Sequence, residues 1–180
     1  AAAVDYIENP KDNDRGYPLV VEKFERDFAA YHDRAFALGM NSGTTSLHAA
    51  FHAVGLGPGD EIIAPTMTFI ATATPVMQLG ATPVFCDCEP DTGNIDPADI
   101  RRKITPRTKA IVITHLCGHP CEMDEIMEIV RANDLYLIED CSHAHGSTYN
   151  GQLVGTFGDI ACFSLGRKIL SSGEAGVMIT

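Results

Sequence analysis

A lysine and an aspartate each follow a strand-like apolar run, and together they could hold an aldehyde cofactor. Lys168 comes shortly after the run that begins at Ile160, and Asp140 closes the run that begins at Leu135. A lysine amine can form a Schiff base with an aldehyde, and a carboxylate can keep a pyridine nitrogen protonated. The pair therefore points to pyridoxal phosphate. The alternatives are a lysine in a surface loop and an aspartate that caps the next turn.

A candidate phosphate site lies at Ser42, Gly43 and Thr44, where an apolar run gives way to a predicted helix. Free N–H groups at a helix N-terminus bind anions, and glycine lets a phosphate approach closely. An ordinary helix cap at Ser42 is the alternative. Ser164, four residues before Lys168, could add a hydroxyl to the same phosphate site.

The neighbours of Asp140 divide between the two faces of its strand. Glu139 and Asp140 are adjacent, so they point to opposite faces and only one of them reaches a given ligand. His143 follows directly and could hydrogen-bond or pack on a ring that Asp140 holds. The alternative is a histidine without a role in the site.

The elements that must position these residues alternate along the chain. We predict strands over residues 35–40, 61–64, 82–87, 110–115, 135–140, 160–165 and 177–180. We predict helices over residues 24–32, after the turn at 41–44 through about 53, over 69–79, from Asp96-Pro97 onward, and over 123–132. Pro75 kinks the helix at 69–79 or marks its late start. The rhythm predicts a three-layer α/β/α fold with a mainly parallel sheet, and ligands bind beyond the carboxyl ends of such strands.

Composition narrows the class of protein. The 180 residues suffice for one well-buried domain, and the net charge of −11 argues against a general nucleic-acid surface. No apolar stretch approaches the length of a membrane span, and no secretory signal is visible. The six cysteines lack the paired C-x-x-C spacing of a zinc site, so we expect reduced thiols in a cytoplasmic protein. A metal at Cys86-Asp87-Cys88 is the disfavoured alternative, and we expect no metal.

Several blocks of sequence stand in one recognisable order: N-S-G-T-T-S-L, G-P-G-D-E-I-I-A-P-T-M-T-F-I-A-T, G-A-T-P-V-F-C-D, E-D-C-S-H-A-H-G and G-E-A-G. In this order they resemble the DegT/DnrJ/EryC1/StrS family of pyridoxal-phosphate sugar aminotransferases, from about Phe24 to Thr180. The resemblance implies the large domain of an aspartate-aminotransferase type (fold type I) enzyme. Residues 1–23 would be an N-terminal segment and residues 24–180 a truncated cofactor-binding domain, with the smaller C-terminal domain absent.

The resemblance also implies a role for each candidate residue. Lys168 would be the Schiff-base lysine and the general acid–base, and Asp140 would pair with the pyridine nitrogen. His143 stands near the ring hydroxyl. Phe69 stands where an aromatic residue stacks on the ring, and its alternative is an ordinary core position. The residues expected around the phosphate are Ser42, Gly43, Thr44 and Ser164.

The reaction implied moves an amino group from an amino acid, usually glutamate or glutamine, to a keto sugar, often nucleotide-linked, or to a cyclitol. Relatives are homodimers with shared active sites. Two alternatives stay open. One is a sugar dehydratase of the same family, whose members carry histidine in place of the lysine. The other is a non-catalytic fragment or interaction module, because the strand at Val177–Thr180 has no closing helix.

Two positions differ from the family's usual pattern. Ser164 and Lys168 are four residues apart, where we expect five in most relatives. Ala175 stands where the usual G-E-G-G block has glycine, which could restrict the backbone there.

Overall fold

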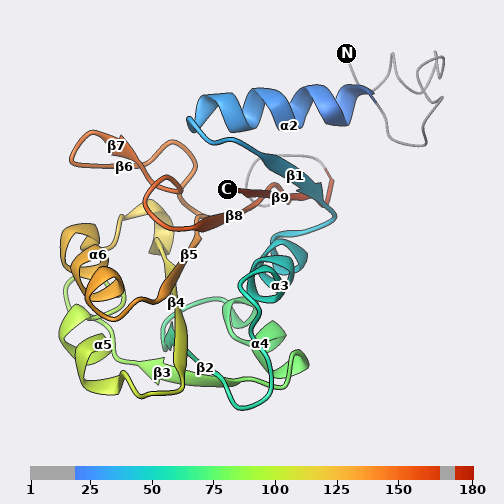
Figure 1. Ribbon diagram of the computed structural model, residues 1–180. Helices are drawn as coiled ribbons and strands as arrows, with labels where there is room; N and C mark the ends of the chain where they lie inside the picture. The colour runs from blue at the N-terminus through green and yellow to red at the C-terminus, as the bar shows by residue number, and fades with distance from the viewer. Residues whose placement is uncertain (1–18, 167–172) are drawn as a thin grey trace.

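The computed structural model describes residues 19–166 and 173–180 (Figure 1). The helices are α2 (Leu19–Tyr31), α3 (Gly43–Ala53), α4 (Thr74–Gln78), α5 (Pro97–Lys103) and α6 (Met123–Ala132), with 3-10 turns η1 (Ile70–Thr72) and η2 (Leu116–Gly118). The strands are β1 (Ala37–Met40), β2 (Glu61–Pro65), β3 (Thr82–Cys86), β4 (Thr108–Thr114), β5 (Tyr136–Asp140), β6 (Thr148–Tyr149), β7 (Gln152–Leu153), β8 (Ile160–Ser164) and β9 (Gly176–Ile179). No described helix is long and apolar enough to cross a membrane.

A seven-stranded sheet in the order β1-β9-β8-β5-β4-β2-β3 forms the middle layer. Strands β3, β2, β4, β5 and β8 run parallel, and β9 is antiparallel to both of its neighbours, β8 and β1. The prediction of a mainly parallel sheet is therefore confirmed. The last strand lies inside the sheet, between β1 and β8.

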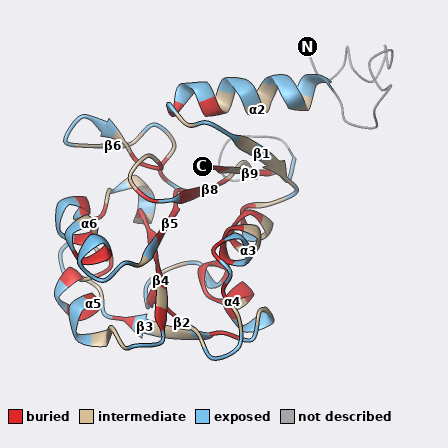
Figure 2. Ribbon diagram, viewed as in Figure 1, coloured by how far each residue is buried: buried red, intermediate tan, exposed pale blue. Residues whose placement is uncertain are grey.

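Helices cover both faces of the sheet, as Figure 1 shows with α3 and α4 on one side and α5 and α6 on the other. Alternate residues of each buried strand enter opposite cores. Val112 of β4 packs with the core under α3 and α4, whereas Ile111 and Ile113 pack with the core under α5 and α6. Burial on both faces explains why the strands read as continuous apolar runs (Figure 2).

Helix α2 covers the end of the sheet that holds β8 and β9. Its residues Phe24 and Phe28 pack on a third cluster that includes Phe163 and Val177. The rings of Phe28 and Phe163 meet edge to face, with centroids 5.1 Å apart. The fold is thus the predicted three-layer α/β/α sandwich, with the described helices on both sides of one sheet.

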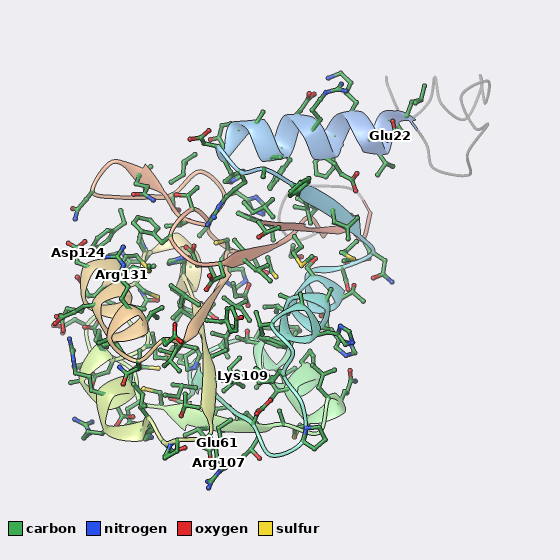
Figure 3. The ribbon with its side chains drawn as sticks, in the orientation of Figure 1. Glu22, Glu61, Arg107, Lys109, Asp124 and Arg131 are labelled. Carbon is green, nitrogen blue, oxygen red and sulfur yellow. The ribbon has the colours of Figure 1, made fainter. Side chains whose placement is uncertain are left out.

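An ion pair joins the amino ends of two neighbouring strands. Glu61 begins β2, and its carboxylate accepts from Arg107, just before β4, and from Thr105 (Figure 3). These bonds hold the pKa of Glu61 below its ordinary value. The pair lies at the opposite end of the sheet from the carboxyl ends, so it fixes register and leaves the other rim free.

The helix predicted over residues 69–79 does not begin at Phe69, and the late start at Pro75 that was considered for it is confirmed. Phe69 is extended, with φ −70° and ψ 140°, and precedes the short turn η1. A separate helix, α4, begins at Thr74 with Pro75 in its first turn. Proline has no N–H to donate to the preceding turn, so it starts a helix well and continues one badly.

Two further differences concern boundaries and a hairpin. Helix α2 begins at Leu19, five residues before the predicted start at Phe24. The hairpin β6–β7 was not predicted, although its turn residues Asn150 and Gly151 both have positive φ. The Asn-Gly pair is a strong signal for this kind of tight turn.

Candidate active site

A pocket of about 680 Å³ lies at the carboxyl ends of the parallel strands. Its walls come from segments that follow β1, β2, β4, β5 and β8, together with the residue stretch that leads into β9. This is the rim where open α/β sheets bind ligands. Seven of the predicted site residues line it: Ser42, Gly43, Thr44, Phe69, Asp140, His143 and Ser164.

Asp140 ends β5 in this pocket and is only 3% exposed. Its Oδ1 accepts from the backbone N–H of Ser142 at 3.1 Å, and its Oδ2 accepts from the Thr72 hydroxyl at 2.8 Å. In this orientation Asp140 caps the turn through Ser142 and also faces the pocket, so the two roles considered for it do not exclude each other. A carboxylate has about four acceptor positions, so acceptor capacity remains for a donor in the pocket.

Glu139 points to the other face of the sheet, as its adjacency to Asp140 predicts. It is fully buried and accepts from His115 Nε2 at 3.1 Å and from the backbone N–H groups of Gly155, Phe157 and Gly158. Burial alone would raise the pKa of Glu139, but these hydrogen bonds outweigh it and hold the pKa below its ordinary value. Glu139 therefore anchors the loop before β8.

His115, Glu139 and Cys141 form the one group of potential metal ligands found within the described residues. The ring of His115 is already engaged on both sides, because its Nδ1 accepts from the Cys121 N–H at 3.1 Å while Nε2 donates to Glu139. Since burial also raises the pKa of Cys141 well above its ordinary value, a thiolate is disfavoured there. The group acts as a structural cluster behind the pocket.

The N-terminus of α3 also lines the pocket, through Ser42, Gly43 and Thr44. Ser42 is its N-cap, and the serine hydroxyl accepts from the Thr45 N–H at 3.2 Å. Within the described part of the chain, no acceptor is paired with the N–H groups of Gly43 and Thr44. Both N–H groups belong to the first turn of the helix, where the helix dipole favours an anion.

Close backbone packing brings Ser164 and β9 to this helix end. A Cβ on Gly43 would lie 3.0 Å from Ser164 Cβ and 3.3 Å from Ser142 Oγ. A Cβ on Gly176 would lie 2.3 Å from both the carbonyl carbon and the oxygen of Ser42. Glycine at 43 and 176 therefore allows β8, β9 and the start of α3 to approach one another closely.

Ala175 fits its position without strain. It does not have a left-handed backbone, and its carbonyl accepts from the Leu165 N–H at 2.8 Å. The glycine of the family's usual block is therefore not needed at 175, whereas the next glycine, Gly176, has no room for a side chain.

Phe69 is 65% exposed and lines the pocket, which excludes the core position considered as its alternative. His143 is exposed and also lines the pocket. His145 belongs to the wall behind, where its Nε2 bonds the Ser164 carbonyl at 2.8 Å and its ring lies against Phe163. Burial lowers the pKa of His145, although the Ser164 hydrogen bond opposes this.

Lys168 lies outside the described residues, and so does Arg167 before it. Gly166 and Glu174, which come before and after the undescribed residues 167–172, both line the pocket. A Cβ on Gly166 would lie 3.0 Å from Glu174 Oε2, so these two flanks approach each other at the pocket wall.

Sequence reasoning missed four polar residues of the site. Ser142, Thr114 and Glu174 line the pocket, and Thr72 donates to Asp140. Ser142 and Thr114 could have been found, because each lies at or just after the carboxyl end of a predicted strand. Thr72 gave no such signal, since it lies within the stretch predicted as helix, where the structure instead has the turn η1.

The arrangement suits a ligand with two different ends. A buried carboxylate at Asp140 can accept from a protonated ring nitrogen, and the first turn of α3 can bind a phosphate. Phe69 offers an exposed aromatic ring that lines the same pocket. These features match the residue types that a phosphorylated pyridine would need.

Comparison with known sequences supports the same interpretation. The pattern of the DegT/DnrJ/EryC1/StrS aminotransferase family matches residues 13–180. The chain is 45% identical over 161 residues to a GDP-perosamine synthase of Escherichia coli O157:H7, covering 89% of this chain and 44% of that protein. It is 43% identical over 167 residues to an L-glutamine:2-deoxy-scyllo-inosose aminotransferase of Streptomyces kanamyceticus, covering 92% and 39%. The chain thus spans less than half the length of these relatives.

Solved structures share the fold. An aminotransferase from Psychrobacter cryohalolentis superimposes with a TM-score of 0.86 at 43% identity, covering 89% of this chain and 41% of that one. NtdA from Bacillus subtilis, solved with bound cofactor PMP, gives a TM-score of 0.83 at 34% identity, covering 89% and 36%. The fold is therefore that of the large domain of pyridoxal-phosphate-dependent aminotransferases of fold type I.

Proposed function

The chain belongs to the DegT/DnrJ/EryC1/StrS aminotransferase family, and on this premise we propose that the protein is a pyridoxal-phosphate-dependent aminotransferase. The observation that carries the proposal is a single pocket that both a buried carboxylate and a helix N-terminus line. Its substrates would be an amino acid and a keto sugar or cyclitol.

The residues present fit pyridoxal phosphate. Asp140 would accept from the ring nitrogen, and the N–H groups of Gly43 and Thr44, with the Ser164 hydroxyl, would bind the phosphate. Phe69 would stack on the ring, and His143 would contact it from the end of β5. When bound, the cofactor supplies an electron sink that stabilises negative charge next to its imine carbon.

Lys168 would be the covalent anchor, and after its release it would carry the proton between the substrate carbon and the cofactor. A basic amine near a cationic ring loses its proton more easily, which suits both tasks. Asp140 would keep the ring nitrogen protonated throughout, and Ser42 would hold the helix end rigid as its N-cap.

The substrate class rests on the names of the relatives. One is a GDP-perosamine synthase and another takes an amino group from L-glutamine to a cyclitol ketone. We propose glutamate or glutamine as donor and a keto sugar, nucleotide-linked, or a cyclitol as acceptor. We further propose that residues 24–180 are the cofactor-binding domain, that residues 1–23 are an N-terminal segment, and that the protein works in the cytoplasm with reduced cysteines.

A homodimer is part of the proposal. Met67, Phe69, Ile70 and Met77 are all large apolar residues that are more than half exposed, and all lie between β2 and the end of α4. Exposed apolar surface beside a pocket is typical of an interface, so a second subunit would cover these residues and complete the site. Ile70→Ser should shift sedimentation toward the monomer. Tyr136→Ser is the matched control, because it also replaces an exposed apolar side chain but lies at the amino end of β5, away from the pocket, and it should not shift sedimentation.

The absorbance of the lysine-bound cofactor tests the proposed function. The intact protein should develop a visible absorbance band when pyridoxal phosphate is added, and Lys168→Ala should abolish it. A protein without this band, or a Lys168→Ala variant that keeps it, would refute the assignment. With a keto-sugar nucleotide and glutamate, loss of water without amino transfer would instead identify a dehydratase.

A further inference from the structure

Four side chains, two of which line the pocket, form a continuous series of hydrogen bonds that ends on Asp140. The Thr114 and Thr68 hydroxyls lie 2.8 Å apart, those of Thr68 and Thr72 also lie 2.8 Å apart, and the Thr72 hydroxyl lies 2.8 Å from Asp140 Oδ2. The series crosses from β4 to the loop after β2, then to η1, then to β5. Thr114 and Asp140 are register partners in the sheet, so the first and last side chains of this hydrogen-bond series lie on neighbouring strands.

The ionised carboxylate fixes the direction of every bond in this series. A carboxylate only accepts, and a threonine hydroxyl has one proton to give. The proton of Thr72 is therefore committed to Asp140, so Thr72 must accept from Thr68. Thr68 has then used its own proton and must accept from Thr114. Bonds aligned in one direction polarise one another, so the last bond, to Asp140, gains strength from those behind it.

The aspartate needs this support to keep one orientation. Rotation about the final torsion of an aspartate side chain meets only broad energy wells. Ser142 N–H holds one oxygen and Thr72 holds the other, which fixes the carboxylate plane at two points. Thr72 is fully buried and Asp140 nearly so, which leaves little access for water to replace a lost hydroxyl.

We propose that Thr72 is a positioning residue that aims the Asp140 carboxylate at the cofactor's ring nitrogen, with Thr68 and Thr114 orienting the Thr72 hydroxyl. The proposal rests on the proposed function, because it assigns Asp140 to a pyridine nitrogen. Thr72 itself acts only through Asp140. Its effect must therefore appear only with a cofactor that has a nitrogen in its ring.

The test compares pyridoxal phosphate with its 1-deaza analogue, in which carbon replaces the ring nitrogen, as ligands of the intact protein. Affinities are measured by absorbance titration. Thr72→Val keeps the shape of the side chain and removes the donor, so it should weaken binding of pyridoxal phosphate roughly tenfold. Binding of the deaza analogue should change less than about twofold, because no nitrogen is there to meet the carboxylate.

Two further variants make the result specific. Thr72→Ser restores the donor and should recover most of the lost affinity, and Thr68→Val should give a smaller loss in the same direction, since it removes only the bond behind Thr72. Thr82→Val, on the exposed edge strand β3, is the matched control and should bind both compounds normally. If Thr72→Val does not fold, Thr68→Val carries the comparison.

Equal weakening for both compounds would overturn the proposal, because it would mean a general structural role. Unchanged affinity of Thr72→Val for pyridoxal phosphate would also overturn it. The proposed function fails separately: a wild-type protein that binds pyridoxal phosphate no better than the deaza analogue has no working Asp140 contact. A wild-type preference for pyridoxal phosphate supports the function whatever the Thr72 variants do.

Discussion

Among the glycines that the structure describes with an ordinary backbone angle, Gly176 is the one whose replacement by alanine should destabilise the protein most. The new Cβ would lie 2.3 Å from the carbonyl carbon and oxygen of Ser42 and 2.7 Å from the N atom of Gly43. Real Cβ atoms essentially never approach within 3.0 Å of such atoms. No rotamer can relieve the clash, because all three atoms belong to the backbone, so β9 and the start of α3 must separate.

The magnitude follows from the kind of atoms that collide. Overpacking a core with flexible neighbours costs about 1–3 kcal/mol. Here two backbone segments must move apart, so we expect a loss of about 3 kcal/mol or more in the free energy of unfolding. That is a large share of the roughly 5–15 kcal/mol that stabilises a typical domain. Because the N–H group of Gly43 would be displaced, binding of pyridoxal phosphate should also weaken.

The assay is urea denaturation followed by circular dichroism. Gly57→Ala is the matched control, because a Cβ there would meet nothing within 4 Å and the backbone angle is ordinary. We expect the control to stay within about 0.5 kcal/mol of the wild type. If Gly176→Ala is as stable as Gly57→Ala, the close approach of β9 to Ser42 is wrong, and so is the phosphate site built on it.

Three further predictions concern single side chains. Glu139→Gln should reduce the loss of unfolding free energy that the wild type shows as pH falls. The pKa of Glu139 is lowered in the folded protein, so the carboxylate stabilises the fold above the ordinary pKa of 4.5, and this stabilisation is lost as pH falls through the folded pKa. Urea melts of both proteins at several acid pH values check this, and identical profiles would contradict it. Ser42→Ala should cost about 1 kcal/mol in urea melts, because the Thr45 N–H loses its acceptor, and Ser42→Thr should cost less; equal losses would argue against a cap. Phe69→Leu should change the free energy of unfolding by less than about 0.5 kcal/mol, because the ring is exposed. It should weaken binding of pyridoxal phosphate roughly fivefold, because stacking of about 1 kcal/mol is lost. A destabilised variant with normal affinity would refute the stacking role.

The strands could be predicted because burial on both faces leaves continuous apolar runs in the sequence. Each predicted strand overlaps a real one, and the carboxyl ends of β1, β5 and β8 deliver Ser42, Asp140 and Ser164 to one pocket. Since parallel strands share a rim, the order of apolar run and polar residue was enough to predict that these side chains meet.

The residues that support the site could not be predicted in the same way. Thr72 reaches Asp140 from 68 positions away, and the sequence contains no local pattern that announces such a bond. Its segment also looked helical, because apolar residues around Pro75 obscure the break between η1 and α4. The need for glycine at 176 is likewise a property of two backbones that meet only in the folded protein.

The position of β1 has a consequence for how the protein is made. In the described sheet β1 pairs with β9 alone, so the strand that leads into the phosphate site has no partner until the last described strand is in place. During synthesis from the N-terminus, the ribosome must release more than a hundred further residues before this contact can close. The anion site is then a late product of folding, and cofactor capture would report that the whole sheet has assembled.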